Sequence, residues 1–258
     1  MAEAAIRVER RGGVVRCTLD RPPLNLFEPG LIAALRSTFE TLATDPTVRL
    51  AVVTGAGRAF TAGMDVHVLH DLDAAGATAL ITALHDAIEA VHKAPFPVLA
   101  AVNGHALGAG FELAIACDLR IAAAEATFGL PEVRVGVPSV IQAALLPPLV
   151  GPARAAELLL TGQTIGAAQA LGWGLVNRVV ARADFEAAVD SMVSAITACA
   201  PGAVRLQKQL IVRWRESDLP SAVRAGIAAF ATAYTTGEPR EGAAAFLEKR
   251  PARFGDPR

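Results

Sequence analysis

The sequence predicts an α/β protein, in which helices cover a sheet on both faces, with a mainly helical region at the C-terminal end. The chain has 258 residues, of which 53% are hydrophobic and 19% charged, enough to build a large core. The apolar runs LAVVTGAG (50–57) and PVLAAVNG (97–104) lack polar alternation, which is typical of strands buried on both faces. Because helical stretches separate these runs, we expect a β/α unit that repeats along the chain.

The first elements are a hairpin and a helix. IRVE (6–9) and VVRCTLD (14–20) are rich in β-branched residues and flank a turn at residues 10–13, RRGG, which predicts two paired strands. Over residues 28–43 the apolar side chains fall at helical spacing, at Leu31, Ile32, Leu35, Phe39 and Leu42. That spacing predicts a helix with one buried face.

Strand, glycine-rich turn and helix then recur. We expect helices at about 76–92 and from about Gly108, a further strand at LRIAAA (119–124), and an irregular stretch rich in Gly and Pro at 126–138. Two more helices are expected at about 139–146 and 152–160, the second of them ended by Gly162.

From Ala183 onward the pattern is mainly helical, with breaks at Pro201, Pro220 and Pro239. No hydrophilic linker separates this part from the preceding one. We therefore divide the chain into an α/β core at 1–195 and a helical C-terminal region at 196–258.

Composition excludes several classes of protein. The 24 Lys and Arg residues nearly balance the 25 Asp and Glu residues, so neither a nucleic acid nor an acidic membrane surface is an expected partner. Cys17, Cys117 and Cys199 lie far apart and form no CxxC pair, so we expect no disulfide framework, no zinc site and a cytoplasmic location.

Neither a signal peptide nor a membrane span is expected. The segment MAEAAIRVERR lacks an apolar run after basic residues. The apolar stretch at 95–117 contains Asn103, His105 and Glu112 together with several Pro and Gly residues, which a spanning helix tolerates poorly. It reads instead as a buried strand, a loop and the start of a helix.

Two glycine-rich loops follow predicted strands, GAGRAFTAGMD (55–65) and NGHALGAGFE (103–112). Such turns present backbone N–H groups, and a helix that follows adds the positive end of its dipole. Two of these loops facing each other would form a site for a developing negative oxygen, whereas a single one is more often only a tight turn. Neither loop matches GxGxxG or GxxxxGK[ST], so binding of a dinucleotide or a P-loop phosphate is not supported.

Two carboxylates are candidates for acid–base chemistry. Glu112 lies in an otherwise apolar run, and Glu132 lies in the loop FGLPEVRVG. Taken singly, Glu112 could be a helix-start residue stabilised by the dipole, and Glu132 could pair with Arg134 in solvent. Together they could position a water molecule and exchange a proton with carbon.

Other catalytic patterns are weak. His67 and His70 form HxxH without an evident third ligand, so we expect no metal site. The serine-hydrolase motif GxSxG is absent from the sequence.

Six segments carry a resemblance to a known family. They are LDRPPLNLF (19–27), GAGRAFTAGMD (55–65), VNGHALGAGFELAIACDLRIA (102–122), ATFGLPEVRVGVP (126–138), LLLTGQTIGAAQALGWGLVNRVV (158–180) and EGAAAFLEKRPARF (241–254). In their order and spacing they resemble the enoyl-CoA hydratase/isomerase (crotonase) superfamily. The resemblance implies a spiral of repeated ββα units with a helical C-terminal region used for trimerisation. A homotrimer or a dimer of trimers is therefore expected.

The resemblance also assigns site residues. It implies an oxyanion hole made of the backbone N–H groups of Met64 and Ala109, with Glu112 and Glu132 as catalytic residues that hold and activate water. By analogy Glu132 exchanges the proton at the α carbon. The substrate would be an acyl-CoA thioester, with no covalently bound cofactor and no metal. The residues implied in binding substrate or CoA are Pro22, Leu24, Leu26, Ala62, Gly63, Asp65, Val66, His67, Gly108, Phe246 and Lys249, the last two reaching the CoA of a neighbouring subunit.

The sequence departs from the family pattern at four places. His67 replaces a common Lys, and Met64 replaces a usual Ala. Ala109 replaces a common Gly, and because Ala tolerates positive φ poorly, we expect the second loop to differ slightly from the family pattern. The segment 138–143, PSVIQA, replaces a glycine-rich stretch and adds apolar bulk beside the site. This segment is where an altered acyl preference is expected.

Three hypotheses follow. The first is a 2-enoyl-CoA hydratase, favoured by the two glutamates. The second is a Δ3–Δ2 enoyl-CoA isomerase or another crotonase-family acyl-CoA hydratase or lyase with a specialised acyl group. The third is a non-catalytic scaffold or RNA-binding relative, which the balanced charge disfavours.

Overall fold

Two sheets form the framework of the protein, and the computed structural model describes residues 4–255. Residues 1–3, which begin the predicted α/β core and the segment MAEAAIRVERR, lie outside the described part. Residues 256–258, which end the predicted helical C-terminal region, also lie outside it. The large sheet has the order β1-β2-β3-β5-β7-β10 and the small sheet the order β4-β6-β8-β9. The strands are β1 (Ile6–Arg11), β2 (Val14–Leu19), β3 (Leu50–Gly55), β4 (Ala59–Thr61), β5 (Val98–Val102), β6 (His105–Leu107), β7 (Leu119–Ala123), β8 (Thr127–Gly129), β9 (Thr164–Gly166) and β10 (Arg178–Val180).

The two sheets are built by a repeated unit. The pairs β3/β4, β5/β6 and β7/β8 each place their first strand in the large sheet and their second in the small one, and helical segments follow each pair. Within each sheet these strands run parallel to their neighbours from other repeats. This arrangement confirms the spiral of ββα units, and the antiparallel pairing of β1 with β2 confirms the hairpin.

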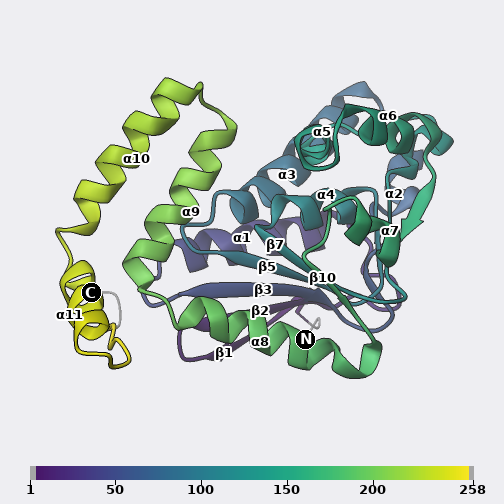
Figure 1. Cartoon of the computed structure of the whole chain (residues 1–258). Helices are drawn as coiled ribbons and strands as arrows, with labels where there is room; N and C mark the ends of the chain where they lie inside the picture. Colours follow the sequence, from purple (N-terminus) through teal and green to yellow (C-terminus); the bar gives the residue numbers. More distant parts are fainter. Residues whose placement is uncertain (1–3, 256–258) are drawn as a thin grey trace.

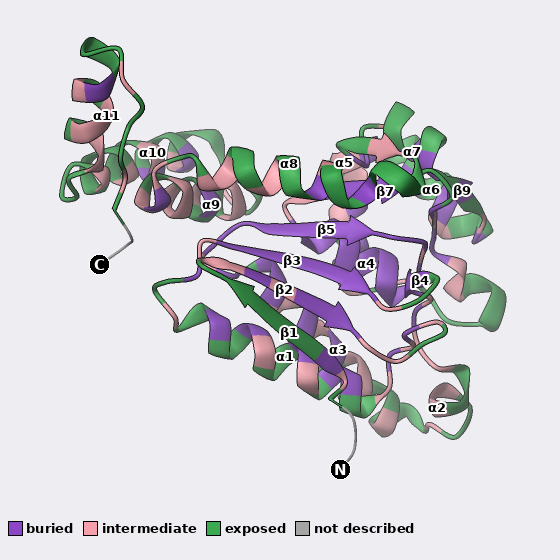
Figure 2. Ribbon diagram, turned by 90° about the horizontal axis from the view of Figure 1, so that it is seen from below, coloured by how far each residue is buried: buried purple, intermediate pink, exposed green. Residues whose placement is uncertain are grey.

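Helices cover both faces of the large sheet (Figures 1 and 2). Alternate residues of β3 point to opposite sides, and both sides are buried. Ala51 and Val53 belong to the larger core, which α1, α3 and α4 close, while Leu50 and Val52 pack against Phe185 of α8. The helices of this part are α1 (Pro29–Ala43), α2 (Val66–His70), α3 (Ala74–His92), α4 (Ala109–Ala116), α5 (Leu146–Val150), α6 (Pro152–Thr161), α7 (Ala167–Gly172) and α8 (Phe185–Thr197).

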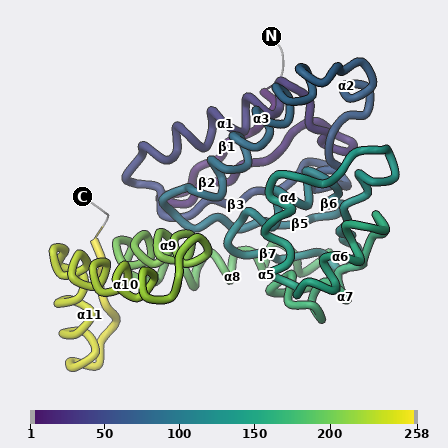
Figure 3. Tube along the Cα trace, turned by 90° about the horizontal axis from the view of Figure 1, so that it is seen from above, coloured from purple at the N-terminus to yellow at the C-terminus, as the bar shows by residue number. Residues whose placement is uncertain are grey.

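The last three helices extend away from the sheets (Figure 3). They are α9 (Pro201–Arg215), α10 (Leu219–Ala233) and α11 (Glu238–Leu247). Each carries its proline in the first turn, where the missing N–H costs nothing, so these prolines begin helices as well as separating them. One buried ion pair holds α9 to the core: Lys208 Nζ lies 2.7 Å from Asp118 Oδ1 and donates to the His92 carbonyl oxygen at 2.8 Å.

Two local predictions were wrong. The helix expected at about 139–146 is a short 3-10 turn, Gln142–Leu145, followed by α5. The stretch 126–138 contains β8 and a 3-10 turn, Pro131–Val135, instead of being irregular throughout. Both errors arise because elements of three to five residues carry too little periodicity to be recognised.

Among residues 4–255 no single helix is both long and apolar enough to cross a bilayer. The segments Arg182–Thr197 and Pro201–Arg215 meet the length and composition test only as a pair, with a bend of 104° between them.

Candidate active site

Three loops meet at one edge of the small sheet. β4, β6 and β8 are neighbouring parallel strands, so their carboxyl ends lie side by side. Ala62 to Met64 follow β4, Gly108 and Ala109 follow β6, and Glu132 lies three residues beyond β8. The carboxyl edge of parallel strands is a common place for a binding site in α/β proteins.

The first loop is held by the segment that precedes α1. Phe27 N–H donates to the Gly63 carbonyl at 2.8 Å, and Asp65 N–H donates to the Phe27 carbonyl at 3.0 Å. These two bonds flank Met64, whose own N–H donates to no acceptor within residues 4–255. The loop therefore offers a backbone donor that the fold leaves unused.

The second loop turns at Gly108, which has φ +53° and ψ −128°. This conformation matches the first central position of a type II′ turn and requires glycine. Ala109 is the first residue of α4, so its N–H has no intrahelical acceptor, and no other acceptor is found for it in the described structure. Gly108 carries the positive φ and Ala109 is helical, so the reason for expecting a different loop at Ala109 does not apply.

The two free N–H groups come from loops that touch. Gly63 has φ +92°, and a Cβ placed on it would lie 3.6 Å from the Ala109 nitrogen and 2.8 Å from the Leu107 carbonyl oxygen. Only glycine fits this approach. Each donor therefore directly follows a glycine that brings the two loops together.

Glu112 lies in the first turn of α4 and is 3% exposed. Its Oε1 accepts a hydrogen bond from Ala143 N–H at 3.0 Å. Burial raises the pKa of Glu112 to about 8; the Glu132 carboxylate acts in the same direction, and the Ala143 N–H acts against it. At neutral pH this carboxyl therefore holds a proton in the free protein.

Glu132 lines the same cavity and lies beside Gly108. Its Oε2 accepts a hydrogen bond from Ser139 Oγ at 2.7 Å. Its Oε1 lies 2.9 Å from where a Cβ on Gly108 would be, so a larger residue there would displace the carboxylate. Arg134 does not neutralise Glu132 in solvent, because its Nε–H donates to the Thr161 carbonyl.

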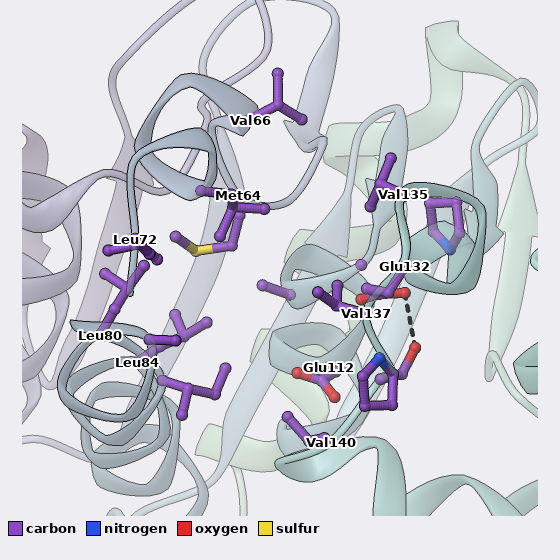
Figure 4. A pocket seen from close by; sticks show the side chains of 18 of the residues that line it. Met64, Val66, Leu72, Leu80, Leu84, Glu112, Glu132, Val135, Val137 and Val140 are labelled. Atoms are coloured by element: carbon purple, nitrogen blue, oxygen red, sulfur yellow. Dashed lines mark hydrogen bonds between the residues drawn. The ribbon is translucent and has the colours of Figure 1, made fainter. Parts of the chain in front are cut away.

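Both glutamates line a cavity of about 440 Å³. Figure 4 shows Glu112 and Glu132 on one wall of this cavity, with Met64, Leu72, Leu80 and Leu84 on the opposite wall. Of the residues singled out in the sequence, the lining includes Ala62, Met64, Val66, Gly108, Ala109, Glu112 and Glu132.

The other expected binding residues lie around the cavity or far from it. Asp65 caps α2 by accepting the His67 N–H at 2.9 Å, and Leu24 accepts the Ala62 N–H at 3.0 Å. Pro22 and Leu26 belong to the same supporting segment. Phe246 and Lys249 do not reach this cavity: they lie on or just after α11, at the end of the molecule away from α2 (Figures 1 and 3).

Two asparagines that sequence reasoning did not single out hold the first loop. Asn25 Nδ2 donates to the carbonyls of Ala56 and Ala59, both at 2.9 Å, and is fully buried. Asn103 Nδ2 donates to the Gly55 carbonyl at 2.9 Å, and its Oδ1 accepts the Gly55 N–H at 3.2 Å. The sequence could have indicated these residues, because each is a polar side chain near apolar residues, where the carbonyl groups of a loop need hydrogen-bond donors.

The histidines do not suggest a metal centre. His70 lies beside Asp71, with Nδ1 and Oδ1 2.6 Å apart, and is exposed. Across residues 4–255 no group of three or more His, Cys, Asp or Glu side chains is arranged to hold a metal ion.

Comparisons with known proteins relate the whole chain to one group of sequences. The family model described as "Enoyl-CoA hydratase/isomerase" matches residues 9–257. The chain is 37% identical to a crotonyl-CoA hydratase of Syntrophomonas wolfei over 260 residues, covering 98% of this chain and 99% of that protein. It is also 37% identical to a mevalonyl-coenzyme A hydratase of Aspergillus fumigatus over 243 residues, covering 92% and 89%.

A solved structure is similar along almost the entire chain. The crystal structure of an enoyl-CoA hydratase from Mycobacterium smegmatis superimposes with a TM-score of 0.95 at 35% identity, covering 98% of this chain and 99% of that one. Sequence and structure therefore lead to one conclusion: this chain belongs to the enoyl-CoA hydratase/isomerase family of enzymes.

Proposed function

We propose that this protein adds water across the 2,3 double bond of a 2-enoyl-CoA thioester. The observation that carries the proposal is the pair of carboxyl groups, Glu112 and Glu132, in one apolar cavity beside two unused backbone N–H groups. Relatives of the chain named as hydratases act on CoA thioesters, which supports the same substrate class here.

The N–H groups of Met64 and Ala109 are assigned to the thioester carbonyl oxygen. Hydrogen bonds to this oxygen draw electron density from the conjugated double bond, so the β carbon becomes electrophilic and the enolate formed on addition is stabilised. Removing one such donor typically costs about 10²–10³ in rate.

The two glutamates are assigned to the water molecule and the α carbon. Addition needs one carboxylate to accept a proton from water and one carboxylic acid to deliver a proton to the α carbon. Family analogy assigns the α carbon to Glu132, whereas burial places the resting proton on Glu112. The proton therefore has to pass to Glu132, by way of the shared water, before addition.

The experiment is the loss of the enoyl-thioester absorbance when protein is added to crotonyl-CoA and decenoyl-CoA. Glu112→Gln and Glu132→Gln should each lower kcat by about 10²–10⁴, the usual contribution of a general acid or base. Glu157→Gln, at an exposed residue of α6, is the matched control and should leave kcat unchanged.

Two outcomes would contradict the hydratase proposal. A parent protein that binds CoA but hydrates neither substrate would reject it. If one Gln variant still converted 3-enoyl-CoA to 2-enoyl-CoA, a single carboxylate would suffice, and the isomerase alternative would be favoured. Exchange of the α proton in D₂O, measured in both variants, tests the assignment to Glu132.

CoA itself is assigned to the segment from Ala62 to His67 and to the neighbouring segment from Pro22 to Leu26. The hydrogen bond from Ala62 N–H to Leu24 supports a shared surface for the two. We assign Phe246 and Lys249 to the CoA of a neighbouring subunit, which their distance from this chain's own cavity supports.

A homotrimer, alone or as a dimer of trimers, is proposed as the assembly. One face of α10 exposes a row of large apolar side chains at helical spacing, and an exposed apolar row of this kind is typical of a contact surface. The row comprises Leu219, Val223, Ile227, Phe230 and Tyr234.

A further inference from the structure

The cavity beyond the glutamates is an aliphatic chamber. On one side α2 and α3 contribute side chains, and on the other side the segment 131–140 contributes valines (Figure 4). The chamber's main aliphatic lining is Leu69, Leu72, Leu80, Ile81, Leu84 and Val140. Binding of a ligand that covers such an apolar surface is favourable because it removes the surface from water.

Away from the reaction centre, the polar side chains that line the chamber are those of Thr78 and Arg134, and both donate hydrogen bonds to backbone carbonyls. Glu112, Glu132 and Ser139 belong to that centre. The Thr78 hydroxyl donates within its own helix to the Ala74 carbonyl at 2.9 Å. Arg134 lines the chamber at an exposed position, where its side chain packs against Gly162 and its Nε–H donates to the Thr161 carbonyl at 3.2 Å.

Aromatic rings are also absent from the residues found to line the chamber. A quaternary ammonium group is usually recognised by the faces of Trp, Tyr or Phe rings. A hydroxyl or carboxyl group on the acyl chain would need a buried hydrogen-bond partner instead. The lining therefore disfavours acyl groups that carry a charge or a hydroxyl, such as a mevalonyl group.

The volume sets the length of chain that fits. A methylene group is close in size to a water molecule, which occupies roughly 30 Å³ in the liquid. The cavity of about 440 Å³ thus holds roughly fifteen such groups, of which the thioester and the reacting water take about four. About ten carbons of acyl chain remain.

We propose that the acyl group is an unsubstituted alkyl chain of medium length, about eight to twelve carbons. This inference rests on the proposed hydratase function and names its substrate class. A four-carbon crotonyl group would leave most of the chamber wall in contact with water, so it should be a poor substrate by comparison.

The first test measures binding without catalysis. Saturated butyryl-, hexanoyl-, decanoyl- and palmitoyl-CoA lack the double bond and cannot be hydrated, so calorimetry reports affinity alone. Each methylene that becomes buried can raise affinity by up to about fourfold, which is 0.8 kcal/mol converted at 25 °C. Decanoyl-CoA should bind at least about tenfold more tightly than butyryl-CoA, with no further gain for palmitoyl-CoA.

The second test measures kcat/KM for the matching 2-enoyl-CoAs. The value should rise from crotonyl-CoA to decenoyl-CoA and then level off or fall. Equal or tighter binding of butyryl-CoA would overturn the inference whatever the activity. Chain-length-dependent binding without hydration of any substrate would reject the proposed function and retain the acyl-chain inference.

A variant that shortens the chamber tests whether the acyl chain binds there. Ala77 on α3 lines the chamber and is exposed, so Ala77→Trp adds bulk there without disturbing the core. Its binding of decanoyl-CoA should fall about tenfold while butyryl-CoA is unaffected. Ala79→Trp, at an exposed residue of the same helix outside the lining, is the control and should change neither.

Discussion

Ser139 Oγ donates a hydrogen bond of 2.7 Å to Glu132 Oε2. Ser139 stands in the segment 138–143, and its hydroxyl therefore holds one of the two carboxylates assigned to catalysis. Ser139 follows Glu132 by seven residues, and the intervening loop turns back so that the hydroxyl reaches the carboxylate.

Removing this hydroxyl should slow the reaction without weakening binding. Ser139→Ala is expected to lower kcat about tenfold, because a hydrogen bond to a charged group contributes about 1.5–3 kcal/mol. KM should change little, since Ser139 lines the cavity at the reaction centre, beside Glu132, and not among the aliphatic side chains of the chamber. Ser139→Thr retains a hydroxyl and should recover most of kcat; a Thr variant as slow as the Ala variant would contradict the role.

Glu112 makes the stability of the protein depend on pH. Its pKa of about 8 in the folded state lies above the ordinary value of 4.5, so the folded state binds more protons than the unfolded state between these pH values. The free energy of unfolding should therefore decrease as pH rises from about 4.5 to about 8, by up to several kcal/mol in total.

Glu112→Gln removes this ionisation and tests the effect. The variant should be more stable than the parent at about pH 9, and the two should be equally stable near pH 5, as measured by urea unfolding. Glu216→Gln, at an exposed residue after α9, should show no such difference. A constant offset between Glu112→Gln and the parent at both pH values would refute the explanation by burial.

Gly108 is expected to be the least replaceable glycine of the site. Gly108→Ala forces an L residue into φ +53° and brings a Cβ within 2.9 Å of Glu132 Oε1. The backbone strain costs about 1–3 kcal/mol. The displaced carboxylate and the altered Ala109 N–H should lower kcat by about 10² or more.

The control for this variant is Gly172→Ala at the end of α7. A Cβ on Gly172 meets no atom within 4 Å, and its φ is not in the positive range that disfavours L residues. This change should leave kcat unaltered and should stabilise the helix by about 0.5–1 kcal/mol. Similar kcat values for Gly108→Ala and Gly172→Ala would show that the loop tolerates a side chain.

Lys208 is expected to anchor α9. It is 2% exposed and donates to Asp118 and to the His92 carbonyl. Lys208→Met leaves the Asp118 carboxylate without its partner and should lower the free energy of unfolding by about 3–5 kcal/mol. Adding Asp118→Asn should recover part of the loss. Lys93→Met, at an exposed ion pair with Glu89, should cost at most about 1 kcal/mol.

The apolar row on α10 should be required for assembly. Ile227→Asp places a charge in the centre of the row and is expected to yield smaller particles in analytical ultracentrifugation, because a buried unpaired charge opposes association. Thr232→Asp, on the opposite face of α10, should leave the mass of the particle unchanged. A trimer that survives Ile227→Asp would place the interface elsewhere.

The sequence alone predicted the long elements, because each has enough residues to show a period. The hairpin, α1, β3, α3, β5 and β7 all lie within a few residues of their expected positions. The motifs with their glycines and glutamates indicated the family, since their order and spacing are unlike those of any single turn. Short elements were missed: β4, β6 and β8 have three residues each and no readable alternation.

The pairing of these three short strands could be seen only in the tertiary structure. By pairing in parallel, they bring the residues after positions 61, 107 and 129 to one edge, although nearly seventy residues separate the outer two. The loop contacts at Gly63 and Gly108, the Ser139 hydroxyl on Glu132 and the aliphatic wall from α2 and α3 all depend on this pairing. Local sequence specifies each loop's conformation through its own φ and ψ preferences. The distances between loops are set by long-range hydrogen bonds and packing, which no local pattern encodes.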